Sequence, residues 1–120
     1  MKLRIKGNTI RLRLSQTEVE QVARDGNASE TTRFPNGELL KYSIEAGEKF
    51  GASFENNEVL ITLREDEIKP WADSDQVSLG GELTLSKGEI LSILVEKDFK
   101  CLTVRPEDES DLFPNPQKSH

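Results

Sequence analysis

The sequence predicts a β-rich α+β fold: a curved antiparallel sheet or partly closed barrel of about six to eight strands, with two short helices. Short segments that alternate apolar and polar residues recur along the chain, and residues suited to tight turns separate several of them. Only two segments carry helix-start signals. The 120 residues fit one domain. We expect it over residues 1–105, followed by an acidic, proline-containing tail at 106–120.

The first two strands are predicted at residues 2–6 and 10–14, where apolar and basic residues alternate. Gly7-Asn8 between them suits a two-residue turn with positive φ. That turn pairs Ile5 with Ile10 on the face expected to meet the core, which predicts a β-hairpin.

A helix is predicted next, at residues 16–25. Ser15 and Glu18 have the spacing of a capping box, in which each side chain satisfies a backbone donor of the other residue. Val19 begins an apolar stripe at helical spacing, and Gly26 is a typical terminator.

Three further hairpins and a second helix are predicted after this helix. The helix is expected from residue 65, where acids favour a helix start, and Pro70 limits its length. Gly80-Gly81 suggests a β-bulge. No internal repeat is apparent from comparing the segments. The predicted strands are residues 29–34, 38–45, 50–55, 58–63, 76–85 and 89–99.

Charge and cysteine content exclude several classes of function. The net charge of −6 disfavours a nucleic-acid-binding protein, because phosphate backbones attract basic surfaces. The single cysteine, Cys101, permits no intrachain disulfide. No apolar stretch has the length of a membrane span or of a signal-peptide core, so we expect no membrane association and a cytoplasmic location. The oligomeric state is left open.

Several segments together resemble a family of small, uncharacterised bacterial proteins that carry a domain of unknown function. The resemblance covers nearly the whole chain and implies one compact domain of bacterial origin, but it brings no activity and no site residues. The segments are Lys2–Leu14 followed by Glu18-Val19, then Glu30–Phe34, Ser74–Val77, Leu94–Phe99 and Cys101-Leu102.

The basic face of the first hairpin is the most informative candidate site. The predicted register sets Arg4 opposite Arg11 and Lys2 opposite Arg13, and like charges across a strand pair are destabilising. Acids of neighbouring strands, Glu96 and Asp98 on one strand face and Glu45 on another strand, could compensate these cations through ion pairs. In the other interpretation the cations form an anion-binding site, because guanidinium groups suit phosphate and carboxylate. The candidate residues are Lys2, Arg4, Arg11, Arg13 and Arg33.

Enzymatic chemistry has weaker support. The only histidine, His120, is the last residue, and Cys101 is expected to be a small core residue. One cysteine and one terminal histidine cannot complete a zinc site, and no cofactor is predicted. Glu96 and Asp98 are weak candidates for binding a hard cation.

A looser similarity is to the triphosphate-tunnel enzymes, in which a curved antiparallel sheet carries inward basic residues for polyphosphate and carboxylates for a metal. This similarity implies a metal-dependent phosphohydrolase as an alternative function. The chain lacks the Glu-x-Glu-x-Lys opening that those enzymes share and has Lys2-x-Arg4-x-Lys6 instead. Whether the protein is an enzyme is therefore left open.

A third interpretation is a protein-interaction module that uses the C-terminal segment. Residues 107–111 contain four acids and no base, and Phe113-Pro114-Asn115-Pro116 follow them. Such a peptide could dock on a partner or on its own domain, through Leu112 and Phe113, although acidic, proline-rich ends are commonly solvated.

Overall fold

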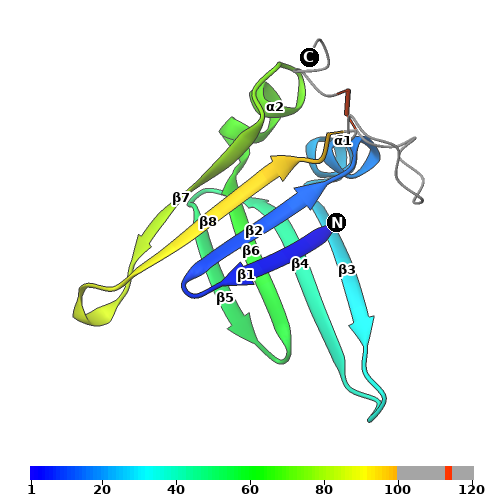
Figure 1. The fold of residues 1–120 in the computed structure, drawn as a ribbon. Helices are drawn as coiled ribbons and strands as arrows, with labels where there is room; N and C mark the ends of the chain where they lie inside the picture. The colour runs from blue at the N-terminus through cyan, green and yellow to red at the C-terminus, as the bar shows by residue number, and fades with distance from the viewer. Residues whose placement is uncertain (100–112, 115–120) are drawn as a thin grey trace, which may run out of the picture.

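The computed structural model describes residues 1–99 and 113–114, and it has an α+β fold (Figure 1). The predicted hairpins and helices are present within a few residues of the expected bounds. The elements are β1 (Lys2–Lys6), β2 (Thr9–Leu14), α1 (Gln16–Asp25), β3 (Asn27–Arg33), β4 (Leu39–Gly47), β5 (Gly51–Glu55), β6 (Glu58–Arg64), α2 (Glu65–Ala72), β7 (Ser78–Thr84), a 3₁₀ turn (Ser86–Gly88) and β8 (Ile90–Lys97).

The strands form two four-stranded sheets and no closed barrel, which corrects the prediction of one curved antiparallel sheet. The first sheet has the order β1-β2-β8-β7, and the second has the order β3-β4-β6-β5. The central pairs β2–β8 and β4–β6 are parallel, whereas all hairpins are antiparallel. Parallel pairs arise because each helix carries the chain from one sheet to the other, so strands distant in sequence meet in the middle of each sheet.

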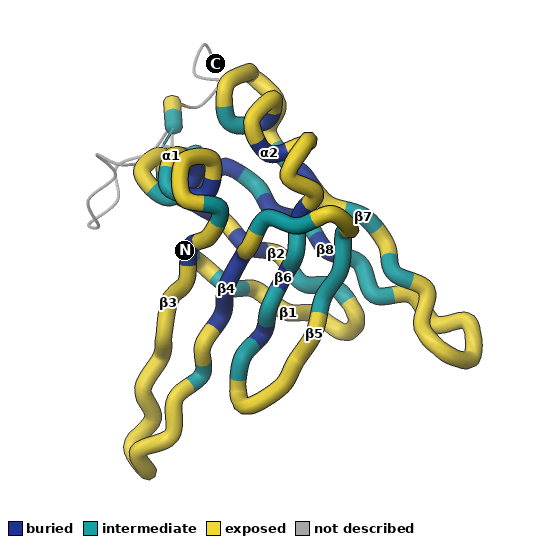
Figure 2. The backbone as a smooth tube through the Cα atoms, turned by 180° about the vertical axis from the view of Figure 1, so that it is seen from behind, coloured by how far each residue is buried: buried dark blue, intermediate teal, exposed yellow. Residues whose placement is uncertain are grey.

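The two sheets pack face to face, and both helices lie at one end of the sandwich (Figure 1). The four hairpin turns point toward the other end, and their tips are exposed (Figure 2). The core lies between the sheets and under the helices. Its most deeply buried members include Leu12, Ile44, Ile61, Trp71 and Val95, none of which exposes any surface.

Local signals placed the first hairpin and α1 correctly. Ile5 pairs with Ile10 across the Gly7-Asn8 turn, as predicted. Ser15 Oγ accepts a hydrogen bond from the Glu18 amide, and the Glu18 carboxylate accepts one from the Ser15 amide, which completes the capping box. The left-handed Gly26 ends the helix.

Gly80-Gly81 do not form a bulge, because the β7–β8 register is continuous from Ser78 to Thr84. The glycines serve close packing instead. A Cβ atom on Gly80 would meet the carbonyl oxygen of Ile93 at 2.1 Å, and one on Gly81 would contact the ring of Phe50.

The structure contains an internal repeat of elements that comparison of the sequence segments did not reveal. Strands β1 to β4 around α1 correspond in order to β5 to β8 around α2. Exchanging the two halves converts the strand order of the first sheet into that of the second. The exchange also converts the parallel β2–β8 pair into the parallel β6–β4 pair, so each half contacts the other in the same way, as in an approximate two-fold relation. We call residues at corresponding positions of the two halves equivalent.

Buried residues and backbone contacts both follow this relation. Leu12 is equivalent to Ile61, and Ile44 to Val95, and all four are fully buried. Among the described residues, every buried apolar residue except Val59 has a buried apolar equivalent; Val59 corresponds to Ile10, which packs against the core. The Lys41 amide donates to the Asn57 carbonyl at 2.9 Å, and the equivalent Ser92 amide donates to the Asn8 carbonyl at 2.9 Å. The repeat is not apparent in the sequence because few residues are identical between the two halves. The halves share only the apolar character of the buried positions and the places of the turns.

Part of the predicted tail docks on the domain. The Phe113 amide donates to the Asp98 carbonyl at 2.8 Å, and its ring meets that of Phe99 edge to face at 5.6 Å between centroids. The boundary at 105/106, Cys101, Leu112, the acidic segment 107–111 and His120 lie outside the described residues. No helix in the described part of the chain is long and apolar enough to cross a membrane.

Candidate functional site

The candidate site is the outer face of the β1–β2 hairpin, the face turned away from the core. The predicted register is confirmed: Lys2 pairs with Arg13, and Arg4 with Arg11. Alternation along each strand puts these cations on one face, while Leu12 and Leu14 point into the core. The cationic side chains are exposed.

The strand order of the first sheet determines which cations meet carboxylates. Across β1, β2, β8 and β7, one row of the outer face reads Lys2, Arg13, Glu96, Ser78. The next row reads Arg4, Arg11, Leu94, Gly80, and the third reads Lys6, Thr9, Ser92, Glu82. The first row therefore brings an acid next to Arg13, while the second row contains two arginines and no acid.

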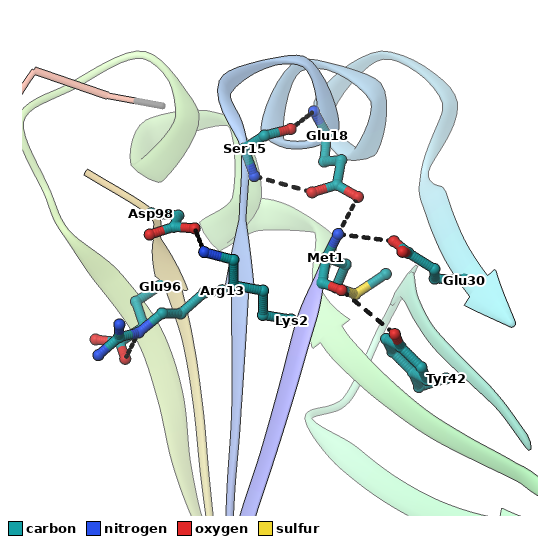
Figure 3. Close-up of polar contacts among 9 residues, drawn as sticks. All are labelled: Met1, Lys2, Arg13, Ser15, Glu18, Glu30, Tyr42, Glu96 and Asp98. Atoms are coloured by element: carbon teal, nitrogen blue, oxygen red, sulfur yellow. Dashed lines mark hydrogen bonds and ion pairs between the residues drawn. The ribbon is translucent and has the colours of Figure 1, made fainter. Parts of the chain in front are cut away.

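The first row is held by ion pairs (Figure 3). Arg13 Nε lies 3.3 Å from Glu96 Oε1, and Lys2 Nζ lies 3.0 Å from Asp98 Oδ2. The Asp98 side chain is only 9% exposed. For Lys2 and Arg13, the structure therefore confirms the prediction that neighbouring acids compensate their charges.

The second and third rows surround a hollow of about 300 Å³ lined by Arg4, Lys6, Thr9 and Arg11. Within the described part of the chain, its three cations form no ion pair. We call this feature the basic hollow. Its lining combines two guanidinium groups, one ammonium group and one hydroxyl group, all of which can donate hydrogen bonds to an anion.

The structure divides the five predicted anion-binding residues into three groups. Arg4 and Arg11 line the basic hollow, while Lys2 and Arg13 belong to the adjacent ion-paired row. Arg33 ends β3 in the second sheet and is not part of this face. Lys6 and Thr9 were missed as site residues, although alternation from Lys2 and Arg4 places Lys6 on the same face and the hairpin register pairs it with Thr9.

The two carboxylates proposed as metal ligands each form an ion pair with a basic side chain. Glu96 contacts Arg13, and Asp98 contacts Lys2. No cluster of three or more potential ligand side chains occurs among the residues that the structure describes. The arrangement is an ion-pair network at the edge of the basic hollow, because each carboxylate already has a cationic partner.

The start of the chain is held next to this network (Figure 3). The Met1 ammonium group is buried and contacts Glu18 Oε2 at 2.5 Å and Glu30 Oε1 at 2.7 Å. Burial lowers the pKa of this group, but its hydrogen bonds to Glu18 and Glu30 outweigh that effect, so its pKa is raised. The ammonium joins β1 to α1 and β3, which fixes β1 at the edge of its sheet.

Comparison with known proteins gives a family without an activity. A family model described as a family of unknown function (DUF7009) matches residues 1–117. No curated protein and no solved structure matches the chain.

Proposed function

The chain belongs to this family of unknown function, and we propose that its basic hollow binds a small oxyanion such as phosphate. The observation that carries the proposal is the contrast between neighbouring rows of one sheet face. Lys2 and Arg13 have acidic partners, whereas Arg4 and Arg11 face each other next to Leu94.

Two opposed arginines without an acid cost stability unless an anion neutralises them. Like charges directly across a strand pair repel each other, and the second row offers only Leu94 and Gly80 beyond Arg11. A bound oxyanion supplies the missing charge, and guanidinium forks match the oxygen geometry of phosphate and carboxylate. The volume of about 300 Å³ is at the lower end of the range for small-molecule sites.

The proposal is restricted to binding. A metal-dependent phosphohydrolase would need free carboxylates beside the anion, and Glu96 and Asp98 already pair with Arg13 and Lys2. A cytoplasmic location and a bacterial origin remain expectations from the sequence, and both are compatible with a phosphate-bearing ligand.

A thermal-shift titration with sodium phosphate tests the proposal, with sodium chloride at equal ionic strength as the reference. At ten times its Kd, an anion that binds only the folded state stabilises it by about 1.4 kcal/mol. For a domain of this size, that corresponds to a rise in Tm of roughly 3–8 °C. Sulfate and tripolyphosphate identify which oxyanion fits best.

Arg11→Gln should remove the phosphate-specific shift, because it deletes the guanidinium in the middle of the unpaired row. Arg33→Gln is the matched control, since it removes an exposed arginine of the second sheet and should leave the shift intact. If no oxyanion shifts Tm beyond chloride, or if Arg11→Gln keeps the full shift, the basic hollow is not a binding site.

A further inference from the structure

We propose that the open end of the sandwich is a self-association surface on which a second copy of this chain docks head to head. The open end is the end opposite α1 and α2, where the turns of all four hairpins lie (Figures 1 and 2). The apolar lining of this end is separate from the basic hollow, and the two proposals share only Lys6, which lines the basic hollow and stands beside the open end.

The floor of the open end is an apolar hollow of about 410 Å³ between the two sheets. Its apolar lining residues come in equivalent pairs, one from each half; Ile5 is matched by Phe54, and Leu40 by Leu91. The hollow therefore lies on the axis that relates the halves. In Ile5 56% of the residue surface is exposed, and in Phe54 66%, although both are large apolar residues.

The walls of the open end repeat the same pattern. Seven large apolar residues are exposed in the described part of the chain, and all but Val77 fall into equivalent pairs. Phe34 and Leu39, at the tip of the β3–β4 hairpin, share a second hollow with Phe54. The three pairs are Ile5 with Phe54, Phe34 with Leu85, and Leu39 with Ile90.

Exposed apolar side chains grouped in this way mark a surface that another molecule covers. Both halves retain them at equivalent positions, although the two halves share few identical residues. A partner that contacts the equivalent residues of both halves in the same way needs two similar surfaces of its own. A second copy of this chain has them, because its two halves carry the same equivalent pairs. Isologous pairing about a two-fold axis is also the commonest form of self-association.

The charges on the two turns beside the hollow select one orientation of that pair. Lys6 is the last residue of β1, directly before its turn, whereas the equivalent last residue of β5 is Glu55. A two-fold axis perpendicular to the line between these turns places each Lys6 near Glu55 of the other copy. An axis along that line would place Lys6 against Lys6 and Glu55 against Glu55, which costs free energy. Complementary charge thus favours the first arrangement.

Sedimentation equilibrium of the full chain over about 1–500 µM tests the proposal. We expect a reversible equilibrium between the 13.5 kDa monomer and its dimer. Phe54→Ser and Ile5→Ser should each raise the dimer Kd at least tenfold, because each removes an apolar group from the floor. Val77→Ser is the matched control: it removes the one exposed large apolar residue that has no equivalent, and it should leave Kd unchanged. Circular dichroism verifies that each variant is folded.

A charge exchange tests the orientation. Glu55→Lys alone should weaken the dimer, because it opposes two lysines, and adding Lys6→Glu in the same chain should restore the original Kd. A chain that stays monomeric to 500 µM overturns the proposal. Binding of an apolar dye by such a monomer, lost in Phe54→Ser, would assign the surface to a small apolar ligand and would likewise overturn it. A dimer that is insensitive to Phe54→Ser and to Glu55→Lys uses another surface and refutes the assignment.

Discussion

Arg13 and Glu96 are neighbours across the parallel β2–β8 pair, and Arg13 Nε lies 3.3 Å from Glu96 Oε1. One row further along the same strands, Arg11 is paired with Leu94. The strands therefore bring a cation and a carboxylate together in one row and two unpaired arginines together in the next. Leu94 holds the position in the second row that Glu96 holds in the first. A single substitution at Leu94 can therefore test the difference.

Leu94→Glu should give Arg11 the acidic partner that Glu96 gives Arg13. We expect it to stabilise the fold by roughly 0.2–1 kcal/mol relative to its control, the size of a cross-strand charge pair, and to abolish the phosphate-specific rise in Tm. Urea unfolding followed by fluorescence of the single tryptophan, Trp71, measures the first effect. Thermal shifts with phosphate measure the second.

The control is Leu60→Glu, the same substitution at a half-buried position in the second sheet. There the cross-strand neighbours are Ser43 and Ser53, so no cation lies directly opposite the new carboxylate. If Leu94→Glu and Leu60→Glu were equally destabilising and phosphate still raised Tm in Leu94→Glu, Arg4 and Arg11 would not be acting as an anion site.

What the sequence predicts well is set by contacts between residues close along the chain. The turn at Gly7-Asn8 determines the pairing of Arg4 with Arg11, and the capping box at Ser15 determines where α1 begins. The pairing of β2 with β8 was not predictable in this way, because local patterns carry no information on which distant strands become neighbours. For the same reason, Glu96 and Asp98 could be predicted as acids that compensate the hairpin cations, but not that Glu96 would pair in one row while the next row received no acid.

Arg33 illustrates the limit most clearly. It lies on a predicted strand, as the hairpin cations do, but β3 follows a helix that carries the chain into the other sheet. The two-sheet arrangement also hid the repeat, since equivalence between Leu12 and Ile61 is visible only once both are found buried at corresponding strand positions.

Gly80→Ala should destabilise the protein strongly, by roughly 2–4 kcal/mol, as severe overpacking does. The new Cβ atom would meet the Ile93 carbonyl oxygen at 2.1 Å, so β7 and β8 would have to separate. Gly51→Ala in β5 is the control, because nothing lies within 4 Å of its added Cβ atom, and it should change the free energy of unfolding by no more than about 0.5 kcal/mol. Similar values for both variants in urea unfolding would show that the strands are not packed this closely.

The ion pairs of Met1 should lose their stabilising effect as the pH rises. Burial lowers the pKa of the Met1 ammonium, but hydrogen bonds to Glu18 and Glu30 raise it above its ordinary value of 8.0. The folded state therefore holds this proton more tightly than the unfolded state, and the contribution to stability is complete below about pH 8 and disappears as the pH passes the folded-state pKa. The free-energy difference between wild type and Glu30→Gln should accordingly shrink between pH 7 and pH 10.

Glu48→Gln serves as the control for that measurement, since it removes an exposed carboxylate in the loop between β4 and β5. Its difference from wild type should not follow the same course. A wild-type advantage over Glu30→Gln that stayed constant up to pH 10 would mean that the contact of Glu30 with the Met1 ammonium does not stabilise the fold.

Lys97 should have the opposite pH dependence. Its side chain is buried beside Trp71 and Phe113, with Nζ 5.9 and 5.3 Å from their ring centroids, and Nζ donates a hydrogen bond of 2.7 Å to the Ser74 carbonyl. Burial lowers the pKa of Lys97 below its ordinary value of 10.5, against the opposing influence of Asp75 and Asp73. Between the folded-state pKa and 10.5 the unfolded state therefore binds more protons, so stability attributable to this group rises with pH.

Lys97→Met keeps an unbranched side chain against Trp71 and removes the titrating group. The free energy of unfolding of wild type minus that of Lys97→Met should therefore increase from pH 8 toward pH 10.5. Lys69→Met, at an exposed position of α2, corrects for the general effect of deleting a lysine. Urea unfolding at each pH, followed by Trp71 fluorescence, supplies the values. If the corrected difference instead fell with pH, the contacts of Lys97 with the two rings and the Ser74 carbonyl would outweigh the cost of its burial. The Lys97 ammonium would then stabilise the fold at the C-terminal end of α2.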